Sequence, residues 1–492
     1  MTIKLSRDTL PAIARHIAVP AYDRAALSAG ILHIGVGNFH RAHQAVYLDD
    51  LFHTGTDCDW ALVGASVRDS DMAMQHDLLS QDLLTTVVAQ EADRASARVT
   101  GSMVAFIAPA DTAAILERLC DPAIRIVSLT ITEGGYYIDP ASQAFDAAHP
   151  DIVADSRAPA APKTAFGLIL AALVRRRSMA IAPFTVMSCD NLPGNGDVAG
   201  NAVAGLARLI DADLAQWVRE HVAFPNSMVD RITPATTARE RRLLEQTYGI
   251  ADTRPVFCEA FRQWVLEDRF PAGRPALEKV GVQFVDDVMP FELMKIRILN
   301  GGHAAIAYPA ALLDIQFAHD AMAEPLIAGF LSRLLDREII PIVPPVPGTD
   351  LGAYKRTIER RFANPKIGDT IRRLCLDGSN RQPKFILPSI SDRLRQGLAV
   401  DGLALLTAFW CRYCYGETES GAAIAPNDPN WQALQALARR ARHAPEEWLG
   451  MSRIFGPLAG NPAYVTAFSA ALARIWREGT RSALRSYLAG AA

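Results

Sequence analysis

Four residues whose side chains can move or hold a proton occur close together between positions 292 and 303. They are Glu292, Lys295, Asn300 and His303. Only seven of the fifty basic residues are lysines, so arginine is used almost wherever a positive charge suffices. Arginine stays protonated at any accessible pH, whereas a partly buried lysine can lose its proton and act as a base. Lys295 is therefore a candidate general base.

A helix would place these four side chains on one face. With Glu292 as zero and about 100° per residue, the other three fall between about −60° and about +80°. This stripe of about 140° is wide enough to face a cleft or the interior. The alternative is structural, because Glu292 and Lys295 could simply form an ion pair three residues apart on the helix.

A glycine-containing turn after a short apolar strand is the second candidate site. It follows the segment 30–34 and opens a helix, so its backbone N–H groups could bind a pyrophosphate. His40 stands where the usual dinucleotide fingerprint has a third glycine, and the motif alone also fits an ordinary strand-to-helix turn. The predicted cofactor contacts here are Gly35, Gly37, Asn38, Phe39, His40 and Arg41.

Two further strand ends carry charged residues. Arg68, Asp69 and Asp71 follow an apolar strand at 60–67, where a carboxylate can bind an adenosine ribose and repel a 2′-phosphate. This favours NAD, although Arg68 leaves some tolerance of NADP open, and a plain solvated loop is the structural alternative. Glu133 follows the strand near 124–132, at a position where ligands bind in parallel sheets.

The order of the predicted elements indicates an α/β fold. Strands alternate with helices through the first half of the chain, which predicts a mostly parallel, doubly wound sheet. Helical periodicity dominates from about position 290. We expect an N-terminal Rossmann-like doubly wound domain over 1–287, followed by a mainly α-helical C-terminal domain over 288–492. The predicted helices include 41–52, 163–177, 198–221, 291–313, 351–362 and 403–415.

Composition and charge exclude several classes of partner. The net charge of −3 and pI of about 6.4 offer no basic field for nucleic acid. No signal peptide and no apolar run of about 18 residues is present, so we expect no membrane partner and a cytoplasmic location. No heptad run argues for an oligomer, and a monomer is the expectation.

No metal is expected. Seven scattered cysteines include one lone pair at Cys411 and Cys414 within the predicted helix 403–415, which indicates reduced thiols rather than a zinc site. His40 and His43 are three residues apart but lack a third ligand at a suitable spacing.

Several segments together resemble the polyol-specific long-chain dehydrogenases. The resemblance spans nearly the whole chain, and the motifs occur in the order typical of that family. The segments are GVGNFHRAHQ (35–44), SLTITEGGY (128–136), SCDNLPGNG (188–196), FPNSMVDRITP (224–234), KIRILNGGH (295–303) and DGSNRQPKF (377–385).

The resemblance implies a metal-independent, NAD-linked secondary alcohol dehydrogenase. By this likeness Lys295 is the general base that takes the substrate hydroxyl proton. Asn191 and Asn300 hold the developing alkoxide, and His303 orients the substrate. Glu292 passes the proton towards solvent.

The same likeness assigns polyol contacts to Asp230, Arg373 and Arg381. Position 381 is often lysine in the family, so the contacts made by Arg381 can differ. The expected reaction is the reversible oxidation of D-mannitol to D-fructose, with a polyol or ketose as the only partner.

Three alternatives stay open. One is a dehydrogenase of another polyol, such as D-arabinitol or D-sorbitol. Another is a fructuronate or tagaturonate reductase, in which Arg373, Arg381 and Lys384 would bind the substrate carboxylate. A non-catalytic NAD-binding sensor is the third, and it gives no reason for four proton-handling groups to share one helical face.

Overall fold

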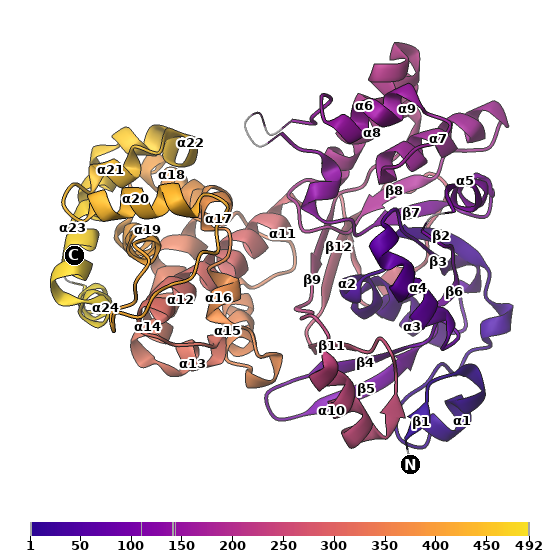
Figure 1. Ribbon diagram of the computed structural model, residues 1–492, viewed down its shortest axis with the longest axis horizontal. Coiled ribbons are helices and arrows are strands. Elements are labelled where there is room, and N and C mark those ends of the chain that lie inside the picture. Colours follow the sequence, from indigo (N-terminus) through magenta and orange to yellow (C-terminus); the bar gives the residue numbers. More distant parts are fainter. Residues whose placement is uncertain (1, 110, 140–141, 143, 491–492) are drawn as a thin grey trace. The chain divides into compact units, whose positions relative to one another are not determined.

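The computed structural model describes residues 2–109, 111–139, 142 and 144–490 (Figure 1). The chain divides into two compact units, Met1–Met289 and Pro290–Ala492. The first unit combines helices and strands. The second unit is built from helices, and its residues 290–490 contain no strand beyond two isolated bridges.

A five-stranded parallel sheet lies at the centre of the N-terminal unit. Of its five strands, the first in chain order is central. The second and third are added on one side of it, and the fourth and fifth on the other. The strand order therefore reverses between β2 and β7, where ligands bind in doubly wound folds. In spatial order the strands are β6 (Met103–Phe106), β3 (Ala61–Ala65), β2 (Ala29–Ile34), β7 (Ile126–Leu129) and β8 (Thr185–Ser188).

Both faces of this sheet are buried. Successive residues of a strand point to opposite faces, and Ile31 and Leu32 accordingly belong to two different hydrophobic clusters. One face packs against α5 (Thr112–Cys120), α7 (Ala165–Ser178) and α8 (Asn195–Ile210). The other packs against α3 (Gln44–His53). Burial on both faces explains the continuous apolar runs that predict these strands, and the doubly wound sheet is confirmed.

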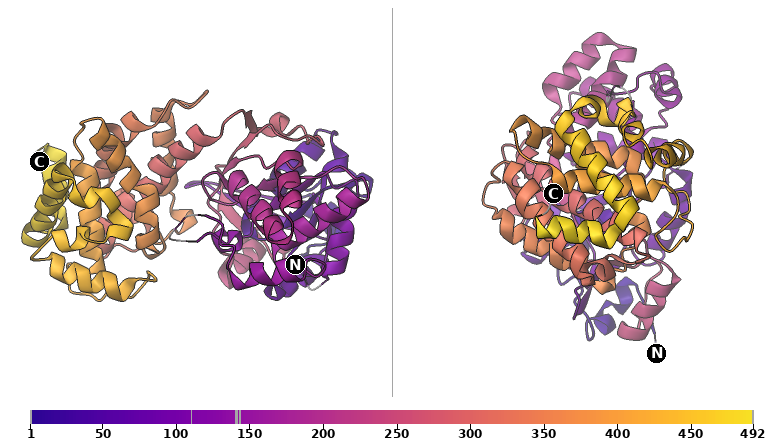
Figure 2. Two further views of the ribbon diagram at one scale, coloured as in Figure 1. Left: turned by 90° about the horizontal axis from the view of Figure 1, so that it is seen from above. Right: turned by 90° about the vertical axis from the view of Figure 1, so that its left-hand side faces the viewer.

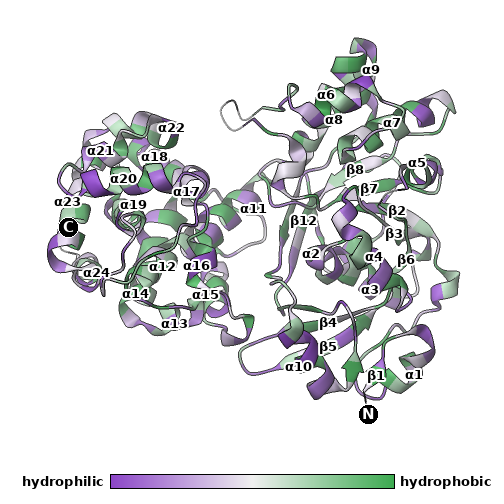
Figure 3. Cartoon of the chain, in the orientation of Figure 1, coloured by the Kyte–Doolittle hydropathy of each residue, from purple (hydrophilic) through white to green (hydrophobic). Residues whose placement is uncertain are grey.

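Three smaller sheets were not evident from the sequence. Their strands are short, and several alternate or carry polar residues. The sheets are β11-β4-β5, with Val256–Glu259, Thr85–Gln90 and Ala95–Thr100; β13-β12-β9, with Gln283–Val285, Gln263–Glu267 and Ser227–Asp230; and β1-β10, with Ile3–Lys4 and Ile250–Ala251. The hydrophilic helix α10 (Ala238–Tyr248), which buries only Leu244, precedes β10 (Figure 3).

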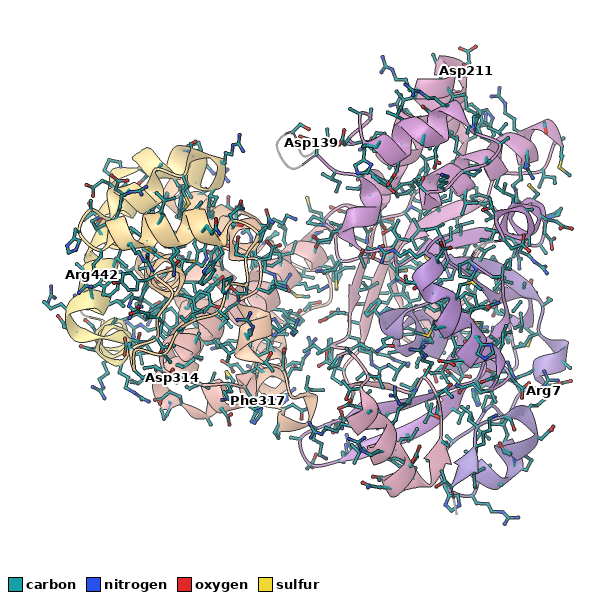
Figure 4. The ribbon with its side chains drawn as sticks, viewed as in Figure 1. Arg7, Asp139, Asp211, Asp314, Phe317 and Arg442 are labelled. Atoms are coloured by element: carbon teal, nitrogen blue, oxygen red, sulfur yellow. The ribbon has the colours of Figure 1, made fainter. Side chains whose placement is uncertain are left out.

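The single helix predicted over 198–221 is wrong, because the chain turns at Asp211 (Figure 4). α8 ends at Ile210 and α9 (Ala212–His221) begins directly afterwards. The Asp211 backbone is extended, and its carboxylate accepts a hydrogen bond from the N–H of Asp213 at 2.7 Å. The predicted helix 41–52 is likewise divided at His43, which separates α2 (Asn38–Ala42) from α3.

The C-terminal unit is organised around α19 (Asp401–Cys414). Every residue of α19 after Asp401 is buried, which is typical of a helix inside a helical domain. It packs against α12, α20 and α23. The helices of this unit are drawn in orange to yellow towards the C-terminus in Figure 2. Cys411 and Cys414 are buried free thiols within it. Other helices of this unit are α11 (Met289–Met294), α12 (Gly301–Leu312), α14 (Pro325–Leu334), α15 (Leu351–Phe362), α16 (Ile371–Leu374), α17 (Gly378–Phe385), α18 (Leu387–Arg395), α20 (Trp431–Ala441) and α23 (Pro462–Glu478).

None of the helices in the described part of the chain is long and apolar enough to cross a membrane.

The cap at Asp211 is expected to contribute to stability. Asp211→Ala should lower the free energy of unfolding by about 1 kcal/mol, because the first N–H groups of α9 lose their acceptor. Urea denaturation measures this change. Asp213→Ala is the matched control, since it removes a nearby carboxylate without removing the cap. Equal losses in the two variants would assign the effect to charge rather than to capping.

Candidate active site

The predicted helix over 291–313 contains a π-helical segment, Lys295–Asn300, between α11 and α12. A π-turn pairs each N–H with the carbonyl five residues earlier, so each turn holds more residues than the 3.6 of an α-helix. Lys295 and Asn300 are five residues apart. The separation of about 140° expected in an α-helix is therefore wrong, and the wider turn brings the two side chains closer to one face.

Burial of the π-helical segment sets the environment of the candidate base. Lys295 is only 8% exposed, and Glu292 and Asn300 are half-buried. A buried amine is shielded from water, and a half-buried carboxylate three residues earlier lies between the interior and solvent. A proton relay from Lys295 through Glu292 stays a prediction.

Arg297 anchors the segment between Lys295 and Asn300. Its guanidinium donates a hydrogen bond to the carbonyl oxygen of Ile342 at 2.6 Å and pairs with the carboxylate of Asp392. Arg297 is only 7% exposed, so both interactions are protected from water. A buried arginine that makes both a hydrogen bond and an ion pair restrains the backbone on either side of it.

His303 lies in the first turn of α12 and is neutral at physiological pH. Its ring stacks on Phe362 with centroids 4.1 Å apart. Burial lowers the pKa of His303 well below its ordinary value, and the positive charge of Arg373 lowers it further. Arg361 and Arg381 act in the same direction. A neutral imidazole offers one donor and one acceptor, which suits it to orient a hydroxyl group.

The two arginines that are predicted to contact the substrate already have partners within the protein. Arg373 is about half exposed and forms a two-bond ion pair with Asp369, in which Nε lies 2.6 Å from Oδ1. Arg381 donates to the carbonyl oxygen of Leu374 at 3.2 Å. The positive charge of Arg373 is therefore partly offset before any ligand binds.

In the N-terminal unit, the loop after β2 requires glycine at position 35. Gly35 has φ +102°, and a Cβ there would lie 2.2 Å from the carbonyl oxygen of Thr130. The Gly35 carbonyl accepts a hydrogen bond from the Thr130 hydroxyl at 2.6 Å, which fixes the turn. At Gly37, by contrast, a Cβ would meet nothing closer than 3.9 Å. The space above this glycine fits the close approach of a dinucleotide phosphate.

The side chains that follow these glycines support the loop. Arg41 is 2% exposed; it donates to the side chain of Asn38 at 2.7 Å and also bonds the carbonyl of Arg254. The His40 ring stacks on His33 with centroids 3.5 Å apart, and burial lowers the pKa of His40 well below its ordinary value. Phe39 stacks on His43. Direct cofactor contacts from these four residues, 38–41, stay predictions.

The acidic residues after β3 form a 3-10 turn, Asp69–Asp71. Asp69 is exposed, whereas Asp71 accepts a hydrogen bond from Ser66. The Arg68 guanidinium lies 3.5 Å from the hydroxyl of Thr132, in the loop that follows β7. Glu133 is exposed and begins the 3-10 turn Glu133–Tyr136 in the same loop. Charged residues of two neighbouring loops therefore lie at the carboxyl edge of the sheet.

Asn191 and Asp230 belong to the N-terminal unit. Asn191 is exposed in the loop after β8, and Asp230 is 5% exposed at the end of β9. The buried Asn195 links these two regions, because its amide bonds the Asp190 carbonyl and the backbone of Ser227, each at 2.9 Å. The joint action of these residues with Lys295 and Asn300 of the C-terminal unit stays a prediction.

Two supporting residues, Asp190 and Asn195, were not singled out from the sequence. The signal was the density of polar residues in the loop 187–196, but spacing alone does not show which of them are buried. Among the residues that the structure describes, no group of three or more potential ligands could hold a metal ion.

Buried neutral histidines should make the fold sensitive to acid. Burial lowers the pKa of His33 and of His43 to about 3, whereas an unfolded chain binds these protons near pH 6.5. The unfolded state therefore binds more protons between these pH values. Each histidine should cost about 1.4 kcal/mol of stability per pH unit as the pH falls below about 6.

Urea denaturation at pH 7 and pH 5 checks this expectation. His33→Gln should reduce the loss of stability between the two pH values, even if it destabilises the protein at both. His76→Gln, on the exposed part of α4 (Met72–Leu79), is the matched control. Identical pH dependence in the wild type and in His33→Gln would contradict the prediction.

Comparisons with known proteins agree with both units. Residues 29–279 match the family model of the mannitol dehydrogenase Rossmann domain, and residues 287–476 match that of the mannitol dehydrogenase C-terminal domain. A mannitol 2-dehydrogenase of Cereibacter sphaeroides is 61% identical over 476 residues, which cover 96% of this chain and 99% of that protein.

Solved structures are similar along the whole chain. The mannitol 2-dehydrogenase of Pseudomonas fluorescens, in a ternary complex with NAD and D-mannitol, is 43% identical with a TM-score of 0.89, covering 99% of this chain and 100% of that one. A substrate-free D-sorbitol dehydrogenase is 34% identical with a TM-score of 0.90, covering 98% and 100%. On the strength of its two family domains and of these relatives, this chain belongs to the mannitol dehydrogenase family.

Proposed function

We propose that this chain is an NAD-dependent dehydrogenase that oxidises D-mannitol to D-fructose reversibly. The observation that carries the proposal is the identity of 61%, over almost the full length of both chains, with a mannitol 2-dehydrogenase. A second relative was solved with NAD and D-mannitol bound together. The scarce and buried Lys295, beside a carboxylate and an amide, gives the chain the chemistry that such a reaction needs.

Lys295 is the base in this proposal. Its neutral amine takes the proton of the reacting hydroxyl group, which raises the electron density on that oxygen. When bound, NAD accepts the hydride from the carbinol carbon. Glu292, half-buried three residues before the lysine, then passes the proton towards solvent.

Asn300 and Asn191 stabilise the alkoxide that develops as the proton leaves. An amide N–H can hydrogen-bond a negative oxygen without giving up its proton, so neutral asparagines suit this task. The π-turn moves Asn300 towards the face of Lys295, so one segment carries both the base and a donor. His303, neutral beside Phe362, would orient a further substrate hydroxyl.

NAD is the proposed cofactor because two features at the carboxyl edge of the central sheet suit it. The open space at Gly37 and the exposed carboxylate of Asp69 suit a pyrophosphate and a ribose diol respectively. A carboxylate at that strand end repels the 2′-phosphate of NADP. Arg68 lies in the adjoining turn and could partly offset this repulsion.

The residues proposed to bind the substrate suit a neutral polyol better than a hexuronate. Arg373 would be the natural partner of a substrate carboxylate, but its guanidinium already forms an ion pair with Asp369. A second carboxylate would have to share that charge. D-Sorbitol is the second candidate substrate, because a D-sorbitol dehydrogenase has a TM-score of 0.90 at 34% identity.

We further propose that the enzyme acts as a monomer in the cytoplasm, with a small polyol or ketose as its partner. Light scattering of the purified protein tests the monomer directly.

Replacement of the base is the first test. Lys295→Ala should lower kcat for mannitol by about 10²- to 10⁴-fold, the usual contribution of a general base. NADH binding, followed by fluorescence, should persist, because the cofactor residues lie elsewhere. Lys366→Ala, at an exposed position of the same unit, is the control and should leave kcat unchanged. A Lys295→Ala enzyme with near wild-type kcat would remove Lys295 from the mechanism.

A substrate panel is the second test. NADH absorbance should give the highest kcat/KM with D-mannitol, a lower value with D-sorbitol and D-arabinitol, and reduction of D-fructose in reverse. NAD should be preferred to NADP with each substrate. Faster reduction of fructuronate or tagaturonate than of D-fructose would overturn the polyol assignment.

A further inference from the structure

Asp190 connects two loops at the carboxyl edge of the central sheet. It follows β8, directly precedes Asn191, and is 8% exposed. Its Oδ2 accepts hydrogen bonds from the N–H of Ile131 at 2.9 Å and from the hydroxyl of Tyr136 at 2.8 Å. Its Oδ1 accepts the N–H of Thr132 at 2.9 Å. One buried carboxylate is thus bonded three times to the loop after β7.

That loop holds an unusual backbone conformation at Thr132. With φ 65° and ψ 162°, this β-branched residue occupies a region that is essentially restricted to glycine. Such a conformation costs about 1–3 kcal/mol and persists only where the surroundings impose it. Asp190 bonds the N–H of Thr132 and that of the residue before it, so its carboxylate is one of the groups that hold this conformation.

The two strands that carry these loops are adjacent. β7 and β8 pair in parallel, and the N–H of Cys189 bonds the carbonyl oxygen of Leu129 at 2.8 Å. The Tyr136 hydroxyl also lies 2.5 Å from the hydroxyl of Ser188. The Asp190 carboxylate is therefore part of a continuous hydrogen-bonded link across the sheet edge, and its position is not set by a single flexible contact.

We propose that Asp190 is a positioning residue, whose carboxylate fixes the loop 131–136 against the loop after β8 and so sets the places of Asn191 and Glu133. The inference rests on the proposed function, in which Asn191 stabilises the alkoxide and Glu133 lies at the cofactor. Both residues are direct neighbours of the bonded groups, at positions 191 and 133.

The charge of the side chain matters because both oxygens accept. An asparagine at position 190 has one acceptor oxygen, and its amino group faces a backbone N–H. At least one of the N–H groups of Ile131 and Thr132 then loses its partner, and Thr132 can relax from its strained conformation. A buried N–H without an acceptor also costs stability.

Asp155 offers a matched control in the same unit. It is 2% exposed and accepts hydrogen bonds from the N–H of Lys163 at 2.8 Å and of Thr164 at 2.9 Å. It also accepts the Thr164 hydroxyl at 2.7 Å. Its bonds are of the same kind as those of Asp190, but they hold the start of α7 and no residue predicted at the site.

The experiment compares Asp190→Asn with Asp155→Asn in the full-length protein. Both should lose thermal stability. Only Asp190→Asn should lower kcat for mannitol, by at least tenfold per folded molecule, and raise the NADH dissociation constant at least threefold. Asp155→Asn should keep both values within twofold of the wild type. Equal kinetic effects in the two variants, or kcat and NADH affinity within twofold of wild type in Asp190→Asn, would overturn the proposal.

A rescue variant tests the route of the effect. Glycine adopts the backbone conformation of Thr132 readily, so Thr132→Gly added to Asp190→Asn should recover kcat at least threefold. No recovery would show that the carboxylate does not act through this backbone. If Asp190→Asn does not fold, Tyr136→Phe removes one donor and keeps both amide bonds. It should lower kcat at least threefold, and an unchanged kcat would overturn the proposal.

The outcomes separate this inference from the proposed function. If the wild type oxidises no polyol, the proposed function fails, and the difference in NADH affinity between the two aspartate variants still tests Asp190. If the wild type is active and the two variants behave alike, only the role of Asp190 fails.

Discussion

The parallel pairing of β2 with β7 determines where the N-terminal unit can bind a ligand. Parallel strands all end at the same edge of the sheet, and the loops on either side of this pair turn away from each other because the strand order reverses there. The loop of Gly35 and the loop of Glu133 leave from these two strands. The Thr130 hydroxyl bonds the Gly35 carbonyl across the pair, so the shape of one loop depends on the other.

Buried polar groups link further loops at the carboxyl edge of the sheet in the same way. Asp190 joins the loop after β8 to the loop after β7, and Asn195 joins the loop after β8 to β9, which ends at Asp230. A buried carboxylate or amide is stable only when all of its hydrogen bonds are made, so each of these groups admits few alternative arrangements. In the C-terminal unit a buried cation is restrained in the same way, because Arg297 is bonded by Asp392 and by a backbone carbonyl.

Sequence patterns predict much of this molecule because the patterns come from burial. The strands of the central sheet are apolar on both faces, and α15 and α19 begin and end within two residues of their predicted ranges. The break at Asp211 was missed because apolar periodicity continues on both sides of it, while a single capping side chain decides where one helix ends. The antiparallel pair β4 and β5 was missed because its short strands carry polar residues, although the two are adjacent in the chain. The pair β9 and β12 was missed because its strands are distant in the chain. The residues from Glu292 to His303 could be selected by type, but the π-turn depends on tertiary packing, and periodicity alone gave the wrong angle between Lys295 and Asn300.

The π-turn ties the angle between two side chains to the pairing of the backbone between them. At the same chain length, α-helical pairing over this segment would return Asn300 to about 140° from Lys295. Apolar residues such as Ile296 or Leu299 can be exchanged for others of similar volume without this effect. A substitution that favours α-helical pairing within the segment would therefore turn Asn300 away from Lys295 while leaving both residues unchanged.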